Sequence, residues 1–332
     1  MIYTDIGIDL GTSNIVIWYK GRGVIIHEPT LAAYDKEHDR LVAFGEEARQ
    51  LILRNTSGIV AIKPFKAGTI SDYSVTERLM RHYIQVAMGR HMFRKPYISL
   101  CVPSGITEVE RRAVVEAAYQ AGARDVVIVE EVVAAAIGAG IDVTKPVGNL
   151  VVDIGGGTTD IAVISLGAPV IKDSIRVAGS DFNEAITRAI RRDHSLFIDL
   201  EQVEQVKIKI GTTVMLPKND TFQITGRNVM TGLPKTVTIT SEEMCEALHD
   251  SVTKIADAVH GVLERITPEL AADITQRGIV LTGGGALLTG MTTLLEEKTG
   301  INTMVAENPS DAVALGTGYY TELMDRLGRI DY

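Results

Sequence analysis

Cysteines and paired histidines are scarce in this chain. Its 332 residues include two cysteines, Cys101 and Cys245, which lie far apart in the sequence and match no metal-binding or redox spacing. The seven histidines include no HxxxH or HxxEH pair. These absences exclude a disulfide-rich secreted domain and a metal site built on such motifs. We expect both cysteines to be reduced, buried thiols of a cytosolic protein.

Long uncharged apolar runs and an excess of positive charge are also missing. No such run reaches the roughly 18 residues of a membrane-spanning helix, because Glu130 and Glu131 interrupt the apolar segment 126–141. The first residues, MIYTDIGIDLGT, show no basic region and no signal-like apolar stretch. The formal net charge of −9 argues against a general nucleic-acid binder. We therefore expect a soluble protein with no nucleic-acid partner.

The sequence does contain an internal echo. Residues 6–20 read IGIDLGTSNIVIWYK, and residues 150–166 read LVVDIGGGTTDIAVISL. Each segment is an apolar strand, an aspartate, a turn rich in glycine and threonine, and a second apolar strand. Asp9 corresponds to Asp153, and Gly11 corresponds to Gly155. Two such hairpins in register predict two similar domains, and the chain is long enough for both with a cleft between them.

Helical and strand patterns alternate along the rest of the chain, which predicts an α/β fold with mixed sheets. Thr107 and Glu110 have the spacing of a capping box at the start of a helix. A polar, β-rich insert is expected at about 212–240. A last helix is expected to start at Asn308-Pro309, with asparagine as the cap and proline in the first turn.

The turns of the two hairpins have the composition of phosphate-binding loops, since glycine lets converging backbone N–H groups approach a phosphate closely. The expected donors are Gly11, Thr12, Ser13 and Asn14 in the first turn and Gly155, Gly156, Gly157, Thr158 and Thr159 in the second. Asp9 and Asp153 precede the turns, and two acids beside a triphosphate require a cation, for which Mg²⁺ held largely through its waters is suited. The alternative is two ordinary tight hairpins with capping aspartates.

Two further features are weaker. The sequence Leu281-Thr282-Gly283-Gly284-Gly285-Ala286 follows a strand and opens a helix, as expected of an adenosine or phosphate contact. No Walker A motif and no GxGxxG fingerprint is present. Glu204 and Lys207 lie three residues apart, hence on one face of a predicted helix. They could bracket a ribose or form a surface ion pair.

These motifs resemble a known family over essentially the whole chain. The segments DLGTSN, DIGGGTTD and LTGGGALL are similar to the two phosphate motifs and the adenosine motif of the actin–Hsp70–sugar-kinase superfamily. The segments KPFKAGTISDY, CVPSGITEVERRA, EEVVAAAIGAG, GRNVMTGLPKTVTI and ENPSDAVALGTG resemble the MreB family of bacterial actins, of the MreB and Mbl types. The resemblance implies an actin-like ATPase fold of two related, ribonuclease H-like domains, each with a smaller subdomain, and a nucleotide in the interdomain cleft.

The resemblance also implies domain boundaries. Domain I would comprise residues 1–144 and about 315–332, with a small subdomain inserted at about 21–70. Domain II would comprise residues 145–314, with a small subdomain inserted at about 183–240.

Carried over to this chain, the resemblance implies roles for individual residues. Asp9 and Asp153 would organise Mg²⁺ and its waters, and Glu131, with help from Thr159, would orient the water that attacks the γ-phosphate. The alternative for Glu131 is a strand-end carboxylate that caps the next helix. The remaining nucleotide contacts would come from Gly11, Thr12, Ser13, Asn14, Gly155, Gly156, Gly157 and Thr158 at the phosphates, from Gly179, Glu204 and Lys207 at the ribose, and from Gly283, Gly284 and Ala286 at the adenosine end.

A short loop, Gly89 to Pro96, places Met92 and Phe93 among three cations. This composition suits shallow insertion into an anionic lipid leaflet, and it resembles the membrane-insertion loop of the family. A filament that carries many copies would gain avidity. The alternative is that both side chains pack onto their own domain.

The resulting hypothesis is a weak ATPase that binds ATP, ADP and Mg²⁺ and polymerises into homopolymeric filaments. These filaments would lie in the cytoplasm at the inner face of the cell membrane and would organise the cell-wall synthesis machinery to set a rod shape. The alternatives are a non-polymerising ATPase of the chaperone or kinase type and a filament of the plasmid-segregation type. A chaperone of the Hsp70 type lacks the length for its substrate domain here.

Overall fold

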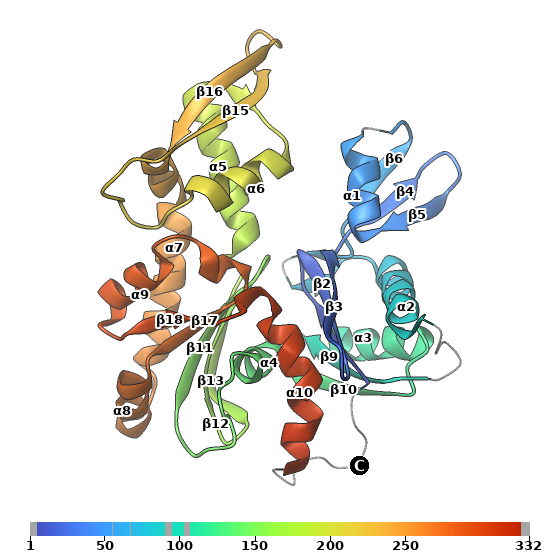
Figure 1. The fold of residues 1–332 in the computed structure, drawn as a ribbon, viewed down its shortest axis with the longest axis vertical. Coiled ribbons are helices and arrows are strands. Elements are labelled where there is room, and N and C mark those ends of the chain that lie inside the picture. The colour runs from blue at the N-terminus through green and yellow to red at the C-terminus, as the bar shows by residue number, and fades with distance from the viewer. Residues whose placement is uncertain (1–4, 55, 67, 90–94, 103–106, 327–332) are drawn as a thin grey trace.

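The computed structural model describes residues 5–54, 56–66, 68–89, 95–102 and 107–326. Two five-stranded sheets form its centre (Figure 1). Sheet I has the order β10-β9-β1-β2-β3, with β1 Ile6–Leu10, β2 Asn14–Tyr19, β3 Gly23–Pro29, β9 Tyr97–Val102 and β10 Asp125–Glu130. Sheet II has the order β13-β12-β11-β17-β18, with β11 Asn149–Ile154, β12 Thr159–Ser165, β13 Ala168–Ile175, β17 Ile279–Thr282 and β18 Thr303–Val305.

The two sheets have the same topology. In each, three consecutive strands pair antiparallel, and two later strands add in parallel beside the first. In the first hairpins Asp9 lies opposite Val16, and Asp153 lies opposite Asp160. Both aspartates are the penultimate residue of their strand. The internal repeat predicted from the sequence is therefore confirmed.

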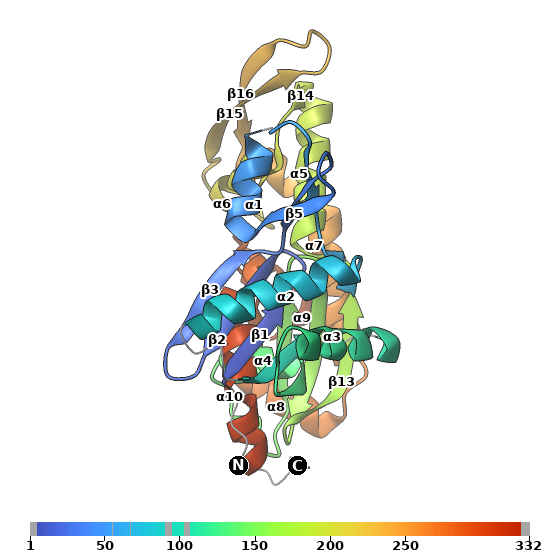
Figure 2. The ribbon, with the colours of Figure 1, turned by 90° about the vertical axis from the view of Figure 1, so that its right-hand side faces the viewer.

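Two helices separate the sheets. α4 (Glu131–Gly138) packs on β11 and β12 of sheet II, and α10 (Ala312–Arg326) packs on β1, β2 and β9 of sheet I. Figures 1 and 2 show α2 (Tyr73–Met88) and α3 (Glu108–Gln120) on the outer face of sheet I. Sheet II carries the helices α5 Gly179–His194, α7 Ser241–Leu263, α8 Pro268–Arg277 and α9 Met291–Thr299. No helix in the described ranges is both long enough and apolar enough to cross a membrane.

A smaller sheet projects from each half at the same end of the molecule (Figure 1). The first contains β4 Ala32–Asp35, β5 Arg40–Phe44 and β6 Ile59–Ile62, with helix α1 Gly45–Leu53; the strands β7 Phe65–Lys66 and β8 Thr69–Ile70 pair nearby in sequence. The second contains β14 Leu196–Phe197, β15 Thr221–Asn228 and β16 Pro234–Thr240, with helix α6 Leu200–Ile210. Since β3 completes sheet I, the part of the predicted insert 21–70 that stands apart begins after Pro29. The domain boundaries stay a prediction.

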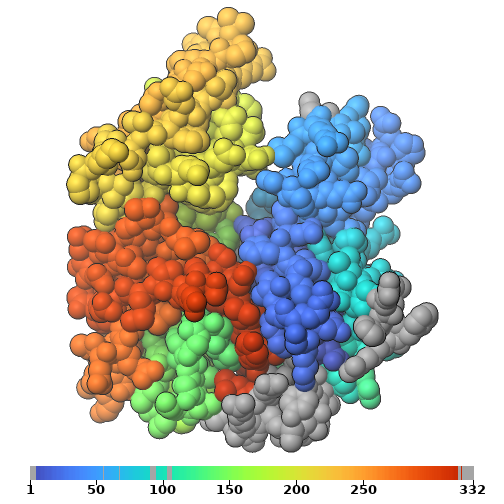
Figure 3. Space-filling model, in the orientation of Figure 1, coloured from blue at the N-terminus to red at the C-terminus, as the bar shows by residue number. Residues whose placement is uncertain are grey.

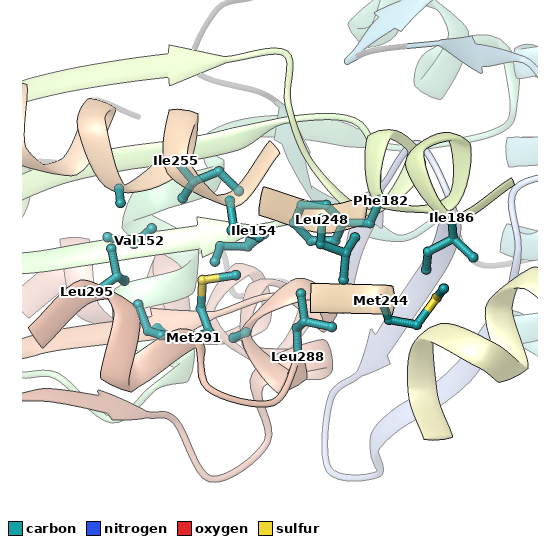
Figure 4. Close-up of a cluster of buried hydrophobic side chains, with 14 of the residues drawn as sticks. Val152, Ile154, Phe182, Ile186, Met244, Leu248, Ile255, Leu288, Met291 and Leu295 are labelled. Atoms are coloured by element: carbon teal, nitrogen blue, oxygen red, sulfur yellow. The ribbon is translucent and has the colours of Figure 1, made fainter. Parts of the chain in front are cut away.

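The largest apolar core lies between sheet II and its outer helices. α7 buries Met244, Leu248, Val252, Ile255 and Val259 at spacings of three and four residues, which places them on one helical face. Figure 4 shows how side chains from α5, α7 and β11 converge in this core, among them Phe182, Ile186, Val152 and Ile154.

The helix starts show what local sequence determines. The Thr107 side chain accepts from the Glu110 amide at 3.3 Å, and the Glu110 carboxylate accepts from the Thr107 amide at 2.9 Å, so the predicted capping box is confirmed. The predicted start of the last helix at Asn308-Pro309 is wrong. Residues Pro309–Asp311 form a 3₁₀ turn, Asn308 makes no side-chain cap, and the Pro309 carbonyl accepts from the Gly283 amide at 2.8 Å instead.

Glycines allow α4 and α10 to cross with their backbones in contact. A Cβ on Gly316 would lie 1.8 Å from the Ala134 carbonyl oxygen, and a Cβ on Gly138 would lie 1.7 Å from that of Ala312. Neither neighbour is a flexible side chain, so a larger residue forces the two helices apart. The close spacing of the two helices, and with it the spacing of the two sheets, therefore requires glycine at both positions.

We predict that Gly316→Ala lowers the free energy of unfolding by about 1–3 kcal/mol, because overpacking at a backbone contact outweighs the gain in helix propensity. The matched control is Gly261→Ala in α7, where a Cβ would meet nothing within 4 Å. That change should be neutral or stabilising by up to about 1 kcal/mol. Urea unfolding of both variants checks the prediction, and equal midpoints would contradict it.

Candidate functional site

The two hairpin turns face each other across a cleft. The cleft encloses about 740 Å³, a volume that includes the open space at its mouth. In Figure 3 the surface is hollowed between the yellow and blue parts, which include α6 and α1. The predicted residues in the lining are Asp9, Gly11, Thr12, Ser13, Asn14, Glu131, Asp153, Gly155, Gly156, Gly157, Thr158, Gly283 and Gly284.

Close contact between the turns requires glycine in the second one. A Cβ on Gly156 would lie 2.0 Å from Ser13 Oγ, and a Cβ on Gly157 would lie 2.7 Å from Thr12 Oγ1. The side chains of the first turn therefore occupy the space that side chains of the second would need. At Gly156 and Gly157 the second turn therefore presents only its backbone, as a polyphosphate cradle requires.

Three carboxyl groups gather at the base of the cleft. Asp153 and Glu131 are buried, and Asp153 Oδ1 accepts from Thr282 Oγ1 at 2.7 Å. Burial, followed by the charges of Asp153 and Asp311, raises the pKa of Asp9 to about 8. Burial also raises the pKa of Asp153 to about 7, and the Asp160 charge adds to this while the Thr282 hydrogen bond opposes it. Burial and then the charges of Asp160, Asp153 and Asp9 raise the pKa of Glu131 well above its usual range.

Among the described residues, no lysine or arginine lines the cleft beside these acids. Glu131 Oε2 is buried and has no hydrogen-bond partner there. No group of three or more His, Cys, Asp or Glu side chains in the described ranges could hold a metal directly. The donor set therefore suits a hydrated divalent cation that keeps several waters and shares phosphate ligands, as Mg²⁺ does, and it does not suit a metal caged by protein.

Five predicted residues lie outside the lining. Thr159 is buried, and its hydroxyl donates to the Val177 carbonyl at 2.7 Å, which ties β12 to the segment between β13 and α5. The Gly179 amide donates to the Gly155 carbonyl at 3.1 Å, so α5 begins directly on the second turn. Ala286 is buried in the core beside sheet II, in a 3₁₀ turn, Gly284–Leu287, where the sequence predicted a helix.

Glu204 and Lys207 are the remaining two predicted residues that lie outside the cleft lining. Lys207 Nζ donates to Glu204 Oε2 at 2.8 Å, so the ion pair considered from the spacing is present. The Lys207 side chain is only 16% exposed, whereas that of Glu204 is 44% exposed. The pair therefore exposes mainly its glutamate side chain to solvent. Met92 and Phe93 of the predicted membrane loop lie outside the described residues.

The structure adds cleft residues that the sequence did not indicate. His27 Nδ1 lies 3.0 Å from Asp311 Oδ1, which joins β3 to the segment before α10. Cys101 lines the cleft on β9, in register with Asp9 on β1. Burial and the surrounding acids raise the pKa of the Cys101 thiol. The thiol therefore stays protonated and unreactive where it lines the cleft. Both cysteines are free and buried, as predicted.

The raised pKa values give a prediction for the protein without nucleotide. Between the ordinary value of 3.8 and about 8, the folded chain binds more protons at Asp9 and Asp153 than the unfolded chain does. The free energy of unfolding must then fall as the pH rises through this window, since the stability present below it is lost as the folded groups ionise.

Asp153→Asn removes one titrating group and should flatten this pH dependence by on the order of 2 kcal/mol between about pH 5 and about pH 8.5. Urea unfolding at several pH values measures the two slopes. Asp257→Asn serves as the control, because Asp257 is in an exposed ion pair with Lys298. A slope for Asp153→Asn parallel to that of the wild type would refute the assignment of the pH dependence to this cluster.

Comparison with known proteins agrees with this geometry. The family model described as MreB/Mbl protein matches residues 3–329. The chain is 46% identical over 327 residues to the cell shape-determining protein Mbl of Bacillus subtilis, covering 98% of each chain. It is 44% identical over 333 residues to the cell shape-determining protein MreB of Escherichia coli strain K12, covering 99% of this chain and 96% of that protein.

A solved structure confirms the predicted actin-like ATPase fold. MreB5 of Spiroplasma citri bound to ADP superposes with a TM-score of 0.91 at 36% identity and covers 97% of both chains. The structure of the same protein bound to AMPPNP gives 0.92 over 98% of both. The family model, the relatives and the solved structures each match almost the whole chain. The chain belongs to the MreB/Mbl family.

Proposed function

We propose that this protein binds and hydrolyses ATP with Mg²⁺ and assembles into membrane-associated filaments that organise cell-wall synthesis and set cell shape. The observation that carries the proposal is the pair of equivalent hairpins, one from each sheet, whose glycine turns and buried aspartates meet in one cleft. The structures of MreB5 with ADP and with AMPPNP support a nucleotide in the corresponding place.

In this proposal the backbone amides of the two turns hold the phosphates from opposite sides. Asp9 and Asp153 hold and orient the waters around Mg²⁺. A bound Mg²⁺ supplies positive charge that offsets the phosphate oxygens and the buried acids. We expect nucleotide binding to require Mg²⁺, because no lysine or arginine among the described residues lines the cleft to supply positive charge instead. Gly283 and Gly284 form the wall on the adenosine side.

Glu131 is the group proposed to act on the attacking water. It is the first residue of α4, it is 8% exposed, and its Oε2 has no partner within the described chain. Such an oxygen can accept a hydrogen bond from a water and orient it toward the γ-phosphate. The neighbouring N-cap residue, Glu130, makes no side-chain cap. The Thr159 hydroxyl donates its hydrogen bond to the Val177 carbonyl, so it can assist the water only by accepting a hydrogen bond from it.

The proposal of self-assembly rests on scale. A chain of this length has a radius of gyration of about 20 Å, far below the dimensions of a cell. The relatives are named as cell shape-determining proteins, and a polymer of many copies can span distances that a single copy cannot. Repeated head-to-tail contacts that do not close into a ring produce such a filament. Many copies of the Met92-Phe93 loop along a filament would also make a weak lipid contact effective.

We predict that Glu131→Gln leaves the affinity for Mg²⁺–ATP within about twofold of wild type and slows phosphate release about 100-fold or more. The change removes the negative charge and replaces one acceptor oxygen with an NH₂ donor, at nearly the same side-chain volume. Glu130→Gln is the matched control, since Glu130 forms an ion pair with Lys172 at 2.7 Å on the surface. Calorimetry and a phosphate-release assay measure the two effects. Normal turnover by Glu131→Gln would exclude this residue as the one that orients the water.

For assembly, we predict that the purified chain pellets with Mg²⁺–ATP and co-sediments with anionic liposomes, whereas Met92→Ser/Phe93→Ser still pellets as a polymer but no longer binds lipid. Leu53→Ser, which changes an exposed apolar residue elsewhere, is the control. Lipid binding by the double variant equal to that of wild type would remove the membrane assignment. Turnover stimulated by a sugar or a peptide, without any polymer, would favour the kinase-like or chaperone-like alternative.

A further inference from the structure

One side chain in the described cleft lining can carry positive charge, and it is that of His27 on β3. His27 pairs with Val16 on β2, and Val16 pairs with Asp9 on β1. Residues paired directly across neighbouring strands project their side chains on the same face of a sheet. The three residues therefore form one row across sheet I, and all three line the cleft. Since neighbouring strands lie about 5 Å apart, His27 stands about 10 Å along this row from Asp9.

Asp311 fixes the orientation of the imidazole ring. His27 Nδ1 lies 3.0 Å from Asp311 Oδ1, and a carboxylate only accepts hydrogen bonds, so Nδ1 is the donor. Asp311 ends the 3₁₀ turn Pro309–Asp311, which is attached to the wall of sheet II because the Pro309 carbonyl accepts from the Gly283 amide at 2.8 Å. Nε2, on the opposite side of the ring, has no hydrogen-bond partner within the described residues. Since the side chain is 40% exposed, this nitrogen is available to a ligand in the cleft.

Negative charge gathers around this imidazole. Burial and then the charges of Asp153 and Asp311 raise the pKa of Asp9 to about 8, so the carboxylate of Asp311 acts on the base of the cleft. A polyphosphate would bring more negative charge to the same wall. An imidazole that has taken up a proton donates hydrogen bonds from both nitrogens. It can therefore offset Asp311 through Nδ1 and a phosphate oxygen through Nε2 at the same time.

The ionisable groups of the neighbouring elements have other partners. Glu28 follows on β3 and points to the opposite face of sheet I, where it accepts from Tyr83 Oη at 2.8 Å. At the start of α1, Glu46 is paired with Arg49 at 2.8 Å. The other ionisable residues of the described lining are one thiol and three carboxyl groups, those of Cys101, Asp9, Glu131 and Asp153. None of these can supply positive charge.

We infer that His27, oriented by Asp311, is a phosphate ligand that binds the nucleotide through Nε2 and takes up a proton from solvent when it does so. Magnesium ions bridge the β- and γ-phosphates in phosphoryl-transfer sites, and Asp9 holds the waters of that ion in the proposed function. His27 lies two strands away from Asp9, beside the Pro309–Asp311 turn, so its phosphate is one that ATP and ADP both carry. The inference rests on the proposed nucleotide binding and adds to it a dependence of the affinity on pH.

The test measures the dissociation constants of Mg²⁺–ADP and Mg²⁺–ATP at about pH 6 and about pH 8, the range over which histidines change charge. His27→Asn keeps a donor near the Nδ1 position for Asp311 but removes Nε2. It should weaken both nucleotides about 10-fold at about pH 6, the size expected for a hydrogen bond between charged groups, and much less at about pH 8. Calorimetry at about pH 7 in two buffers of different ionisation enthalpy should show that wild type takes up more protons on binding than the variant does. The difference between the two proteins isolates His27, because Asp9 and Asp153 are present in both.

His38→Asn is the matched control, because His38 Nδ1 also pairs with an aspartate, Asp35 Oδ2 at 2.8 Å, in an exposed position outside the described cleft lining. It should keep the wild-type affinities and proton uptake. If His27→Asn does not fold, His27→Gln, which keeps a donor near the Nε2 position but cannot take up a proton, must lose the extra proton uptake in its place. Wild-type affinities and proton uptake in the folded His27 variant, as expected of a residue that only joins β3 to the Pro309–Asp311 turn, overturn the inference alone. Absence of any Mg²⁺–nucleotide binding by wild type overturns the proposed function as well.

Discussion

Burial of several acids in one cleft is the constraint on which the rest of the structure depends. Asp9 from β1, Asp153 from β11 and Glu131 from α4 come from three separate elements, and burial is the main cause of the raised pKa of each. Neighbouring acids raise these pKa values further, with Asp160 acting on both Asp153 and Glu131. Such a cluster opposes folding at neutral pH unless a cation compensates it. The surrounding scaffold must therefore be strong enough to hold the acids together without that cation. The large core beside sheet II and the glycine-lined crossing of α4 and α10 provide this strength.

The same scaffold gives the cleft a direct mechanical path to the rest of the molecule. α4 begins at Glu131 in the cleft, and Ser310 and Val313, at the start of the α10 segment, also line it. The two helices then cross at Gly138 and Gly316 with backbone in contact. Because no side chains separate them at the crossing, a displacement of either helix at the cleft moves the other. In the proposed function, a nucleotide in the cleft would act on the arrangement of the two sheets through this helix pair.

The sequence predicted the parts of the fold that depend on neighbours along the chain. The hairpins at Asp9 and Asp153 and the capping box at Thr107 each use residues within a short span, so their patterns are visible without a structure. The contact between His27 and Asp311 joins residues 284 positions apart, and Cys101 reaches the cleft only because β9 adds in parallel beside β1. The last helix begins late because the Pro309 carbonyl bonds to Gly283, a partner that no local signal identifies. The hydrogen bond from Asn183 on α5 to Glu204 on α6 was not predicted for the same reason, since it depends on how the two helices pack.

The proposed site holds the two ends of the nucleotide with different parts of the molecule. The phosphate end is lined by turns from both sheets, so tight binding there requires the halves to be together. In the arrangement that the family resemblance implies, α5 and α6 contact the ribose, and both helices belong to one half. A nucleotide can therefore stay attached to that half through its ribose while the phosphate end responds to loss of the γ-phosphate. A ligand shifts a conformational equilibrium only by its differential affinity for the two states, and in this cleft that difference arises at the phosphates. ATP and ADP can thus both remain bound while favouring different separations of the two halves.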